Sequence, residues 1–305
     1  MIRIRRGVDL PIAGEPVQTV STGATTRTVA LVAADYIDMK PTMAVGEGDR
    51  VKLGQRLFTD KKTTGVHYAS PGGGKVVAVN RGAKRAFQSI VIELDDEGRE
   101  DAEEFPKFAA GDLDALGRDT VKGNLVNTGL WSSLRARPYS KVPSPETAPH
   151  SIFVSAIDTS PLAVDPAVVI SERQSDFIAG LRVIKHLTDG KLFVCKSPGQ
   201  SIPGADLKFV TTSEFSGPHP AGLPGTHIHF LDPVSERKTV WYLNYQDVIA
   251  IGATFLTGRL SVERVISLAG PAVTNPRLLR TRLGASTEAL TAGELKPADN
   301  RIISG

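Results

Sequence analysis

The sequence predicts a multidomain protein of the α/β and α+β classes. Its 305 residues are enough for two or three domains. The 29 glycines and 20 prolines indicate many turns between short strands. The middle of the chain alternates short apolar runs with a segment of helical periodicity, which is typical of an α/β sheet.

Composition excludes several classes of protein. The chain has 36 basic and 33 acidic residues, a balance that argues against a dedicated nucleic-acid-binding protein. Its one cysteine, Cys195, excludes an internal disulfide and an iron–sulfur cluster held by this chain alone. We interpret Cys195 as a small buried residue of a strand. No apolar run approaches the ~20 residues of a membrane span, and no signal peptide is seen, so we expect a soluble, cytoplasmic or membrane-peripheral chain.

The first domain is predicted over residues 1–100 and is best marked over 28–100. Alternation at residues 2–6 predicts a strand, and the apolar run 28–33 predicts a buried one. Residues 45–57 (VGEGDRVKLGQRL) and 69–79 (ASPGGGKVVAV) alternate apolar residues with glycine turns. These two blocks resemble the halves of a biotinyl/lipoyl-like barrel-sandwich hybrid domain.

Lysines between the two barrel halves raise the question of a carrier function. In carrier domains a lysine at a hairpin tip is modified, and Lys61 and Lys62 lie near that place. The segment is shorter than in a carrier and lacks the tip motif, so a solvated turn is the preferred interpretation. The GGGK run at residues 72–75 is not a phosphate loop, because Val76 follows the lysine and a strand follows the run.

A Rossmann-like α/β domain is predicted over residues 101–257, after an acidic linker with its boundary near 97–105. We expect buried strands at 150–156, 192–195 and 207–212, with a helix over 166–187 between the first two. The loop after the first strand reads IDTSPLAVDP at residues 157–166. Two aspartates and two prolines replace the glycines of a dinucleotide fingerprint, which argues against bound NAD or FAD.

Basic and aromatic residues are interleaved over residues 129–143. One interpretation is a basic loop bounded by Pro138 and Pro143. The other is a pocket wall, because aromatic rings stack on a flat ligand and arginines bind its oxygens. The residues concerned are Trp131, Arg135, Arg137, Tyr139 and Lys141.

Residues 215–230 contain three glycines, three prolines and three histidines. Because proline fixes φ and glycine permits positive φ, we expect a shaped loop rather than a helix or a central strand. His227 and His229 would face the same side if they lay on a strand, and with His219 they could offer three metal ligands. The preferred interpretation is structural: the imidazoles pair with buried backbone groups, and no metal is bound.

A third domain is predicted over residues 258–305. A strand over 239–245 and a helix over 246–258 precede it. A small β unit begins at residues 262–270, and a last strand is expected at 303–305. No nucleophile elbow or other self-contained catalytic arrangement is found, so the isolated chain is not expected to be catalytic.

Together these motifs resemble the A subunits of bacterial Na⁺-translocating NADH:quinone oxidoreductases. The resemblance covers nearly the whole chain and implies that residues 258–305 are a β-grasp domain of the soluble-ligand-binding type. The chain stops before the family's C-terminal region, so it looks truncated and this domain would be incomplete at its C-terminus. The motifs are GVDLPIAG (7–14), QSIVIE (88–93), GLW (129–131), DTSPL (158–162), GPHPAGLPGTHIH (217–229), YQDVIAIG (245–252), RTRLGA (280–285) and DNRIISG (299–305).

The resemblance implies a peripheral protein on the cytoplasmic side of the bacterial inner membrane. It would belong to a six-subunit complex that oxidises NADH, reduces ubiquinone and exports Na⁺. Flavins and iron centres would belong to partner subunits, with no cofactor on this chain. The membrane-embedded B subunit and ubiquinone are the expected partners, with a role in the step from ubisemiquinone to ubiquinol.

A quinone pocket is the sharpest hypothesis for the site. Stacking and hydrogen bonds to oxygens are what a quinone head group needs. Its predicted walls are the basic and aromatic segment and residues 32–39, with His219, His227 and His229 as a structural loop. The alternative is a scaffold that docks membrane subunits and has no ligand. The candidates are Trp131, Arg135, Arg137, Tyr139, Lys141, Tyr36 and Met39.

Overall fold

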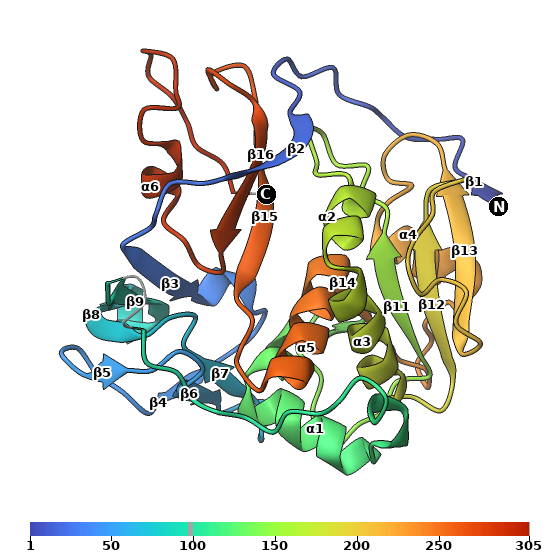
Figure 1. The fold of residues 1–305 in the computed structure, drawn as a ribbon, viewed down its shortest axis with the longest axis horizontal. Coiled ribbons are helices and arrows are strands. Elements are labelled where there is room, and N and C mark those ends of the chain that lie inside the picture. The colour runs from blue at the N-terminus through green and yellow to red at the C-terminus, as the bar shows by residue number, and fades with distance from the viewer. Residues whose placement is uncertain (97–99, 305) are drawn as a thin grey trace.

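A computed structural model describes residues 1–96 and 100–304. Its strands form two small barrel sheets, one six-stranded mixed sheet with helices on both faces, and one three-stranded sheet (Figure 1). The expected domain boundary near 97–105 lies partly outside the described residues.

The barrel region consists of two antiparallel sheets that share a core. One sheet has the order β3-β9-β8-β5 and the other β4-β6-β7. In β9 every second side chain points inward, so that Ile90 and Ile92 are fully buried, beside Phe58 and Tyr68 of the second sheet. The strands are β3 (Thr28–Val32), β4 (Pro41–Met43), β5 (Arg50–Val51), β6 (Arg56–Asp60), β7 (His67–Ala69), β8 (Gly74–Arg81) and β9 (Phe87–Leu94), with 3-10 turns η1 (Ala33–Asp35) and η2 (Ala83–Arg85).

The six-stranded sheet is the Rossmann-like part of the molecule. Its order is β1-β13-β12-β11-β14-β10, parallel except for β10. β11 is buried over its whole length because helices cover both sheet faces, with α3 and α5 on one and α4 on the other (Figure 1). Its elements are β1 (Ile2–Arg3), α1 (Arg118–Asn127), β10 (Arg135–Arg137), β11 (Ser151–Ala156), α2 (Pro166–Glu172), α3 (Gln174–Lys185), β12 (Lys191–Lys196), β13 (Val210–Ser216), α4 (Pro224–Leu231), β14 (Val240–Asn244) and α5 (Tyr245–Thr257), with η3 (Leu113–Ala115) and η4 (Leu130–Ser133).

Several predicted elements need correction. The helix expected over 166–187 is two helices, because Arg173 leaves helical backbone angles between α2 and α3. The strand expected at 207–212 begins only at Val210. The prediction of a loop over all of 215–230 was wrong for its second half. Pro224 occupies the first turn of α4, where a missing N–H costs nothing, so proline starts this helix instead of preventing it.

The third sheet combines the end of the chain with its beginning. β15 (Glu263–Leu268) pairs antiparallel with β16 (Arg277–Arg282), and β16 pairs in parallel with β2 (Val17–Thr22). The short helix α6 (Thr287–Thr291) follows. Ile303 and Ser304 are not in a strand, contrary to prediction, and Gly305 lies outside the described residues.

The N-terminal segment crosses the whole molecule before it enters the barrel. In Figure 1 the blue trace leaves β1 beside β13, passes over the top of the molecule to β2, and then descends to β3. Residues 1–27, which the sequence places with the barrel, thus contribute strands to the two other sheets. Alternation of apolar and polar residues cannot reveal such a pairing, because it predicts that a segment is a strand but not which strand it pairs with.

Candidate functional site

The segment 129–143 lies against the barrel, where the two regions meet. Gly129 adopts a positive φ of 76°, and a Cβ there would come within 2.7 Å of the Ala69 Cβ. The turn before η4 therefore contacts strand β7 closely. The predicted facing of residues 32–39 and 131–141 is present: Arg135 donates to the Asp35 carbonyl (3.2 Å), and its guanidinium lies 5.5 Å from the Tyr36 ring centroid.

Behind Arg135 is a cluster of aromatic rings. Tyr36 contacts Tyr68 edge to face at 4.7 Å, and Tyr68 stacks on Phe58 at the same centroid distance. Burial raises the pKa of both tyrosines, so both phenols stay protonated at neutral pH. The Tyr68 hydroxyl is buried and has no hydrogen-bond partner among the residues that the structure describes. A buried hydroxyl without a partner is rare in a folded protein and calls for an explanation.

An ion-pair bridge closes the exposed side of this junction. Asp38 of the barrel pairs with Lys62 of the barrel and with Lys141, whose Nζ lies 2.6 Å from the carboxylate. Hydrogen bonds to these two lysines lower the pKa of Asp38 to about 2. The pairs tie the turn between β6 and β7, where Lys61 and Lys62 lie, to the segment after β10.

The remaining predicted pocket residues do not share one surface. Trp131 is fully buried, donates its indole N–H to the Pro143 carbonyl (2.8 Å) and packs edge to face on Trp241. Tyr139 is 74% exposed, and Met39 is half-buried against the core. Arg137 donates to Ser140 (3.0 Å) and also approaches α4 at Gly225. Only Arg135, Tyr36 and Lys141 thus belong directly to the junction.

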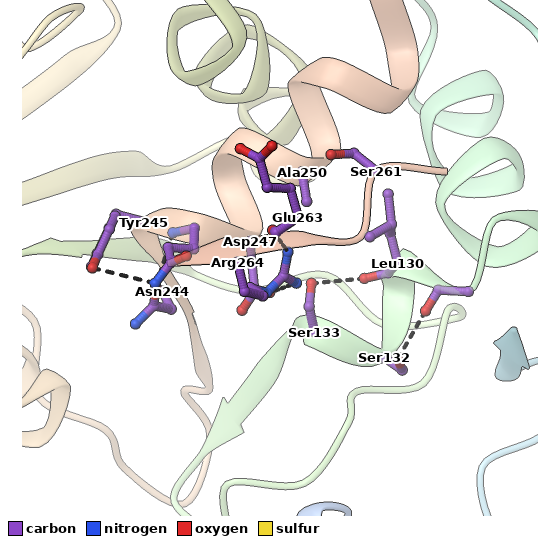
Figure 2. A network of polar contacts seen from close by, with 12 residues as sticks. Leu130, Ser132, Ser133, Asn244, Tyr245, Asp247, Ala250, Ser261, Glu263 and Arg264 are labelled. Atoms are coloured by element: carbon purple, nitrogen blue, oxygen red, sulfur yellow. Dashed lines mark hydrogen bonds and ion pairs between the residues drawn. The ribbon is translucent and has the colours of Figure 1, made fainter. Parts of the chain in front are cut away.

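A polar network next to η4 joins the third sheet to the Rossmann-like sheet (Figure 2). Arg264, at the start of β15, pairs with Asp247 in the first turn of α5 at 2.9 Å. Asn244 caps the same helix by accepting the Gln246 N–H at 2.8 Å. In η4, Ser133 donates to the Leu130 carbonyl. The start of α5 is therefore held by the Asn244 cap and by the ion pair with Arg264.

The carboxyl ends of β11 and β14 form the switch point of the sheet, where α/β folds usually bind nucleotides. Asp158 here accepts the Ser160 N–H, and Asp165 caps α2. These carboxylates also contribute to raising the pKa of Tyr245, after burial as the main cause. The loop offers acceptors and negative charge, so it suits no pyrophosphate.

The three histidines of the 215–230 segment do not converge. His227 and His229 lie on helix α4, so the alternative that places both on one face of a strand is wrong. His227 donates from Nε2 to the Ala221 carbonyl (2.9 Å) inside the fold, and His219 contacts Thr159. His229 is exposed at the surface. Within residues 1–96 and 100–304 no three His, Cys, Asp or Glu side chains are arranged to hold a metal.

Sequence reasoning missed Tyr68 and Asp38. Alternation in the strand around residues 67–69 marks Tyr68 only as inward-facing, and nothing local indicates that its hydroxyl lacks a partner. Asp38 adopts a positive φ of 65° in a turn, and its two lysines come from distant segments. Both features depend on contacts made by the complete fold.

Comparison with known families divides the chain into three parts. Residues 2–95 match the NqrA N-terminal barrel-sandwich hybrid domain, residues 116–260 the NqrA second alpha/beta domain, and residues 265–305 the NQRA C-terminal domain. The predicted fold class is confirmed by these matches. No helix among the described residues is long and apolar enough to cross a membrane.

Curated relatives are similar over the full length of this chain. The A subunit of the Na(+)-translocating NADH-quinone reductase of Pseudomonas aeruginosa is 58% identical over 305 residues, covering 100% of this chain and 67% of the relative. The proteins of the same name from Saccharophagus degradans and Marinomonas are 57% and 55% identical over 305 residues, covering 100% of this chain and 68% and 67% of their own lengths.

Proposed function

This chain belongs to the family of A subunits of the Na⁺-translocating NADH-quinone reductases, and we propose that its junction between barrel and Rossmann-like sheet binds ubiquinone. The chain is one component of that multi-subunit enzyme complex. Within it we place the chain at the cytoplasmic face of the membrane, next to the membrane-embedded B subunit. Electrons would arrive from cofactors held by partner subunits.

The Tyr68 hydroxyl, which has no hydrogen-bond partner among the described residues, is the observation that most supports ubiquinone binding at the junction. The Tyr68 O–H is a buried hydrogen-bond donor that has no acceptor among the described residues, and a quinone carbonyl oxygen could accept this hydrogen bond. Phe58 and Tyr36 supply aromatic surface against a flat head group, and Arg135 supplies positive charge beside it. Negative charge that develops on the ring during reduction is stabilised by such a guanidinium.

Access to Tyr68 depends on Tyr36. The Tyr36 ring covers Tyr68 edge to face and is itself half-buried at the junction. A head group would enter by displacing this ring, and Arg135 could follow the ring only by breaking its hydrogen bonds to the backbone carbonyls of Ser132, Leu134 and Asp35. The proposal therefore requires Tyr36 to move on binding.

Titration of the chain with a short-chain ubiquinone tests this proposal. We expect saturable binding that Tyr68→Phe and Arg135→Gln each weaken roughly tenfold, through the loss of a hydrogen bond and of a charge. Arg237→Gln is the control, because Arg237 is exposed and makes no hydrogen bond or ion pair with any described residue. Absence of saturable binding would favour a scaffold without a ligand. Photo-crosslinking of a quinone analogue exclusively outside residues 32–68 and 129–143 would also contradict the proposal.

A further inference from the structure

An open hollow of about 560 Å³ lies beside the N-terminal strand, separate from the junction. One wall is formed by Arg3, the last residue of β1, and by residues 4–6 after it. The other wall is formed by the loop before α4 and by α4 itself. Both β1 and β13 end at this place, and the two strands are parallel. The hollow therefore lies outside the carboxyl ends of two strands at the edge of the sheet, away from the switch point between β11 and β14.

Three arginines of the hollow have no acidic partner. Arg3, Arg5 and Arg6 line it, and none of their side chains makes a hydrogen bond or ion pair with any residue in the described part of the chain. None of the described residues that line it is acidic. Other arginines are neutralised, as Arg264 is by Asp247 and Arg277 by Glu294.

The backbone that bears these arginines is held in place. Ile4 donates its N–H to the Ser216 carbonyl at 2.8 Å, and Val8 donates to the His219 carbonyl at 2.9 Å. A Cβ at Gly7 would lie 2.0 Å from that same carbonyl oxygen, so only glycine fits there. The three guanidinium groups are thus presented from a fixed segment and not from a free tail.

The opposite wall adds a helix end and an aromatic ring. At the start of the eight-residue helix α4, Pro224 has no N–H and the Thr226 and His227 N–H groups donate to the Leu223 carbonyl, so that only the Gly225 N–H, at the hollow, has no acceptor among the described residues. Gly225 also adjoins Arg137, whose guanidinium would lie 3.2 Å from a Cβ there. Phe230 is 53% exposed and packs edge to face against His229 at 5.0 Å.

We propose that this hollow binds a phosphate-bearing ligand with a flat ring, the chemical class of the mononucleotides. Arginine pairs with phosphate through two parallel hydrogen bonds, and the helix end favours the same negative charge. Phe230 offers its ring face to the base. The volume lies within the range of roughly 300–1,000 Å³ that holds small ligands. The site does not use the acidic loop at residues 157–166, which suits no phosphate.

Titration of the full chain with adenosine 5′-monophosphate tests the inference. We expect saturable binding that added salt weakens, and a loss of roughly tenfold or more in the double variant Arg5→Gln/Arg6→Gln. Both arginines are exposed, so the variant should fold, which circular dichroism checks. Arg237→Gln removes an equally exposed arginine outside the hollow and should bind as the wild type does. Phe230→Ala should weaken the binding of the nucleotide but not the binding of inorganic phosphate.

Three results would overturn the inference. The first is no saturable binding of the nucleotide, or equal binding in the double variant and the wild type. The second is equal binding of adenosine, because the arginines would then have no role. The third is arginine-dependent binding to phosphatidylglycerol vesicles that the nucleotide does not compete with, which would make this face a membrane contact. Ubiquinone binding at the junction should be unchanged in Arg5→Gln/Arg6→Gln, so the two proposals can fail separately.

Discussion

His227 illustrates, at the scale of a single residue, how burial sets the charge of a side chain. Its ring is fully buried, and burial lowers its pKa from 6.5 to about 4. The folded state therefore holds a neutral imidazole, with Nδ1 3.4 Å from the Ser155 hydroxyl. Because the unfolded chain takes up the proton at higher pH, stability is complete above pH 6.5 and is lost as the pH falls toward 4.

Replacing His227 should make this pH dependence disappear. We expect His227→Gln to lower the free energy of unfolding at pH 7 by about 1–3 kcal/mol, through imperfect hydrogen bonding. Between pH 7 and pH 4 the variant should lose up to about 3 kcal/mol less than the wild type. Urea unfolding at several pH values measures both effects. His229→Gln, at an exposed position on the same helix, should follow the wild-type curve.

Asp38 should also lose its contribution to stability as the pH falls, but over a lower pH range. Its lysine partners hold its folded pKa near 2, below the usual 3.8, so its contribution is present above pH 4 and is lost as the pH falls toward 2. Asn tolerates the positive φ at this position, which makes Asp38→Asn a conservative test. We expect the stability difference between wild type and variant to shrink from pH 4 to pH 2 and with added salt. A difference that stays constant over this range would exclude the ion-pair bridge as its cause.

At the scale of elements, the contact between α3 and α5 is set by two glycines. A Cβ at Gly180 would lie 2.0 Å from the Val248 carbonyl oxygen, and one at Gly252 would lie 1.8 Å from the Asp176 carbonyl oxygen. The two helix backbones therefore touch directly, and a larger residue would push them apart.

Gly252→Ala should destabilise the protein by at least about 2 kcal/mol, because overpacking forces the backbone to shift. Gly123→Ala in α1 is the matched control, since nothing lies within 4 Å of a Cβ there. That variant should be neutral or more stable by up to about 1 kcal/mol, through helix propensity. Thermal unfolding followed by circular dichroism compares the two. Equal effects would contradict the close backbone contact.

The elements that the sequence predicts well are those whose signals are local. The spacing of Val248, Ile251 and Phe255 and the final Gly258 predict α5, which ends with Gly258 in the left-handed conformation. The run 150–156 predicts β11, which is buried on both faces. α4 was missed because its prolines and glycines are also loop residues, and only the position of Pro224 in the first turn reconciles them with a helix.

At the scale of the whole molecule, Glu100 connects the three regions. Its carboxylate accepts the Gly73 N–H of the barrel at 3.0 Å, Arg282 of β16 at 2.6 Å and Arg259, after α5, at 3.1 Å. It is also 19% exposed, so the interactions are only partly screened by water.

We expect Glu100→Gln to lower the free energy of unfolding by about 1–2 kcal/mol, because the neutral side chain no longer pairs with the positive charges of Arg282 and Arg259. In a chain of this size that corresponds to a fall of about 2–4 °C in Tm. Calorimetry measures it, with Glu104→Gln as the control. Glu104 is exposed and has no partner within the described ranges, so its replacement should leave Tm unchanged.

The sequence by itself determined the family, the fold classes and the lack of a nucleotide fingerprint at the first strand. These properties are written in short local patterns, such as the glycine turns of residues 45–57 and the acidic loop 157–166. It also predicted that residues 32–39 lie opposite the basic and aromatic segment.

Only the tertiary structure decided which side chains meet. It buried Trp131, left Tyr68 without a hydrogen-bond partner among the described residues and brought Asp38 to two lysines. It also took β1 and β2 away from the barrel and placed Arg5 and its neighbours against α4. The physical reason is range: periodicity and turn chemistry act over a few residues, whereas burial and charge pairing depend on neighbours that lie far away in the chain.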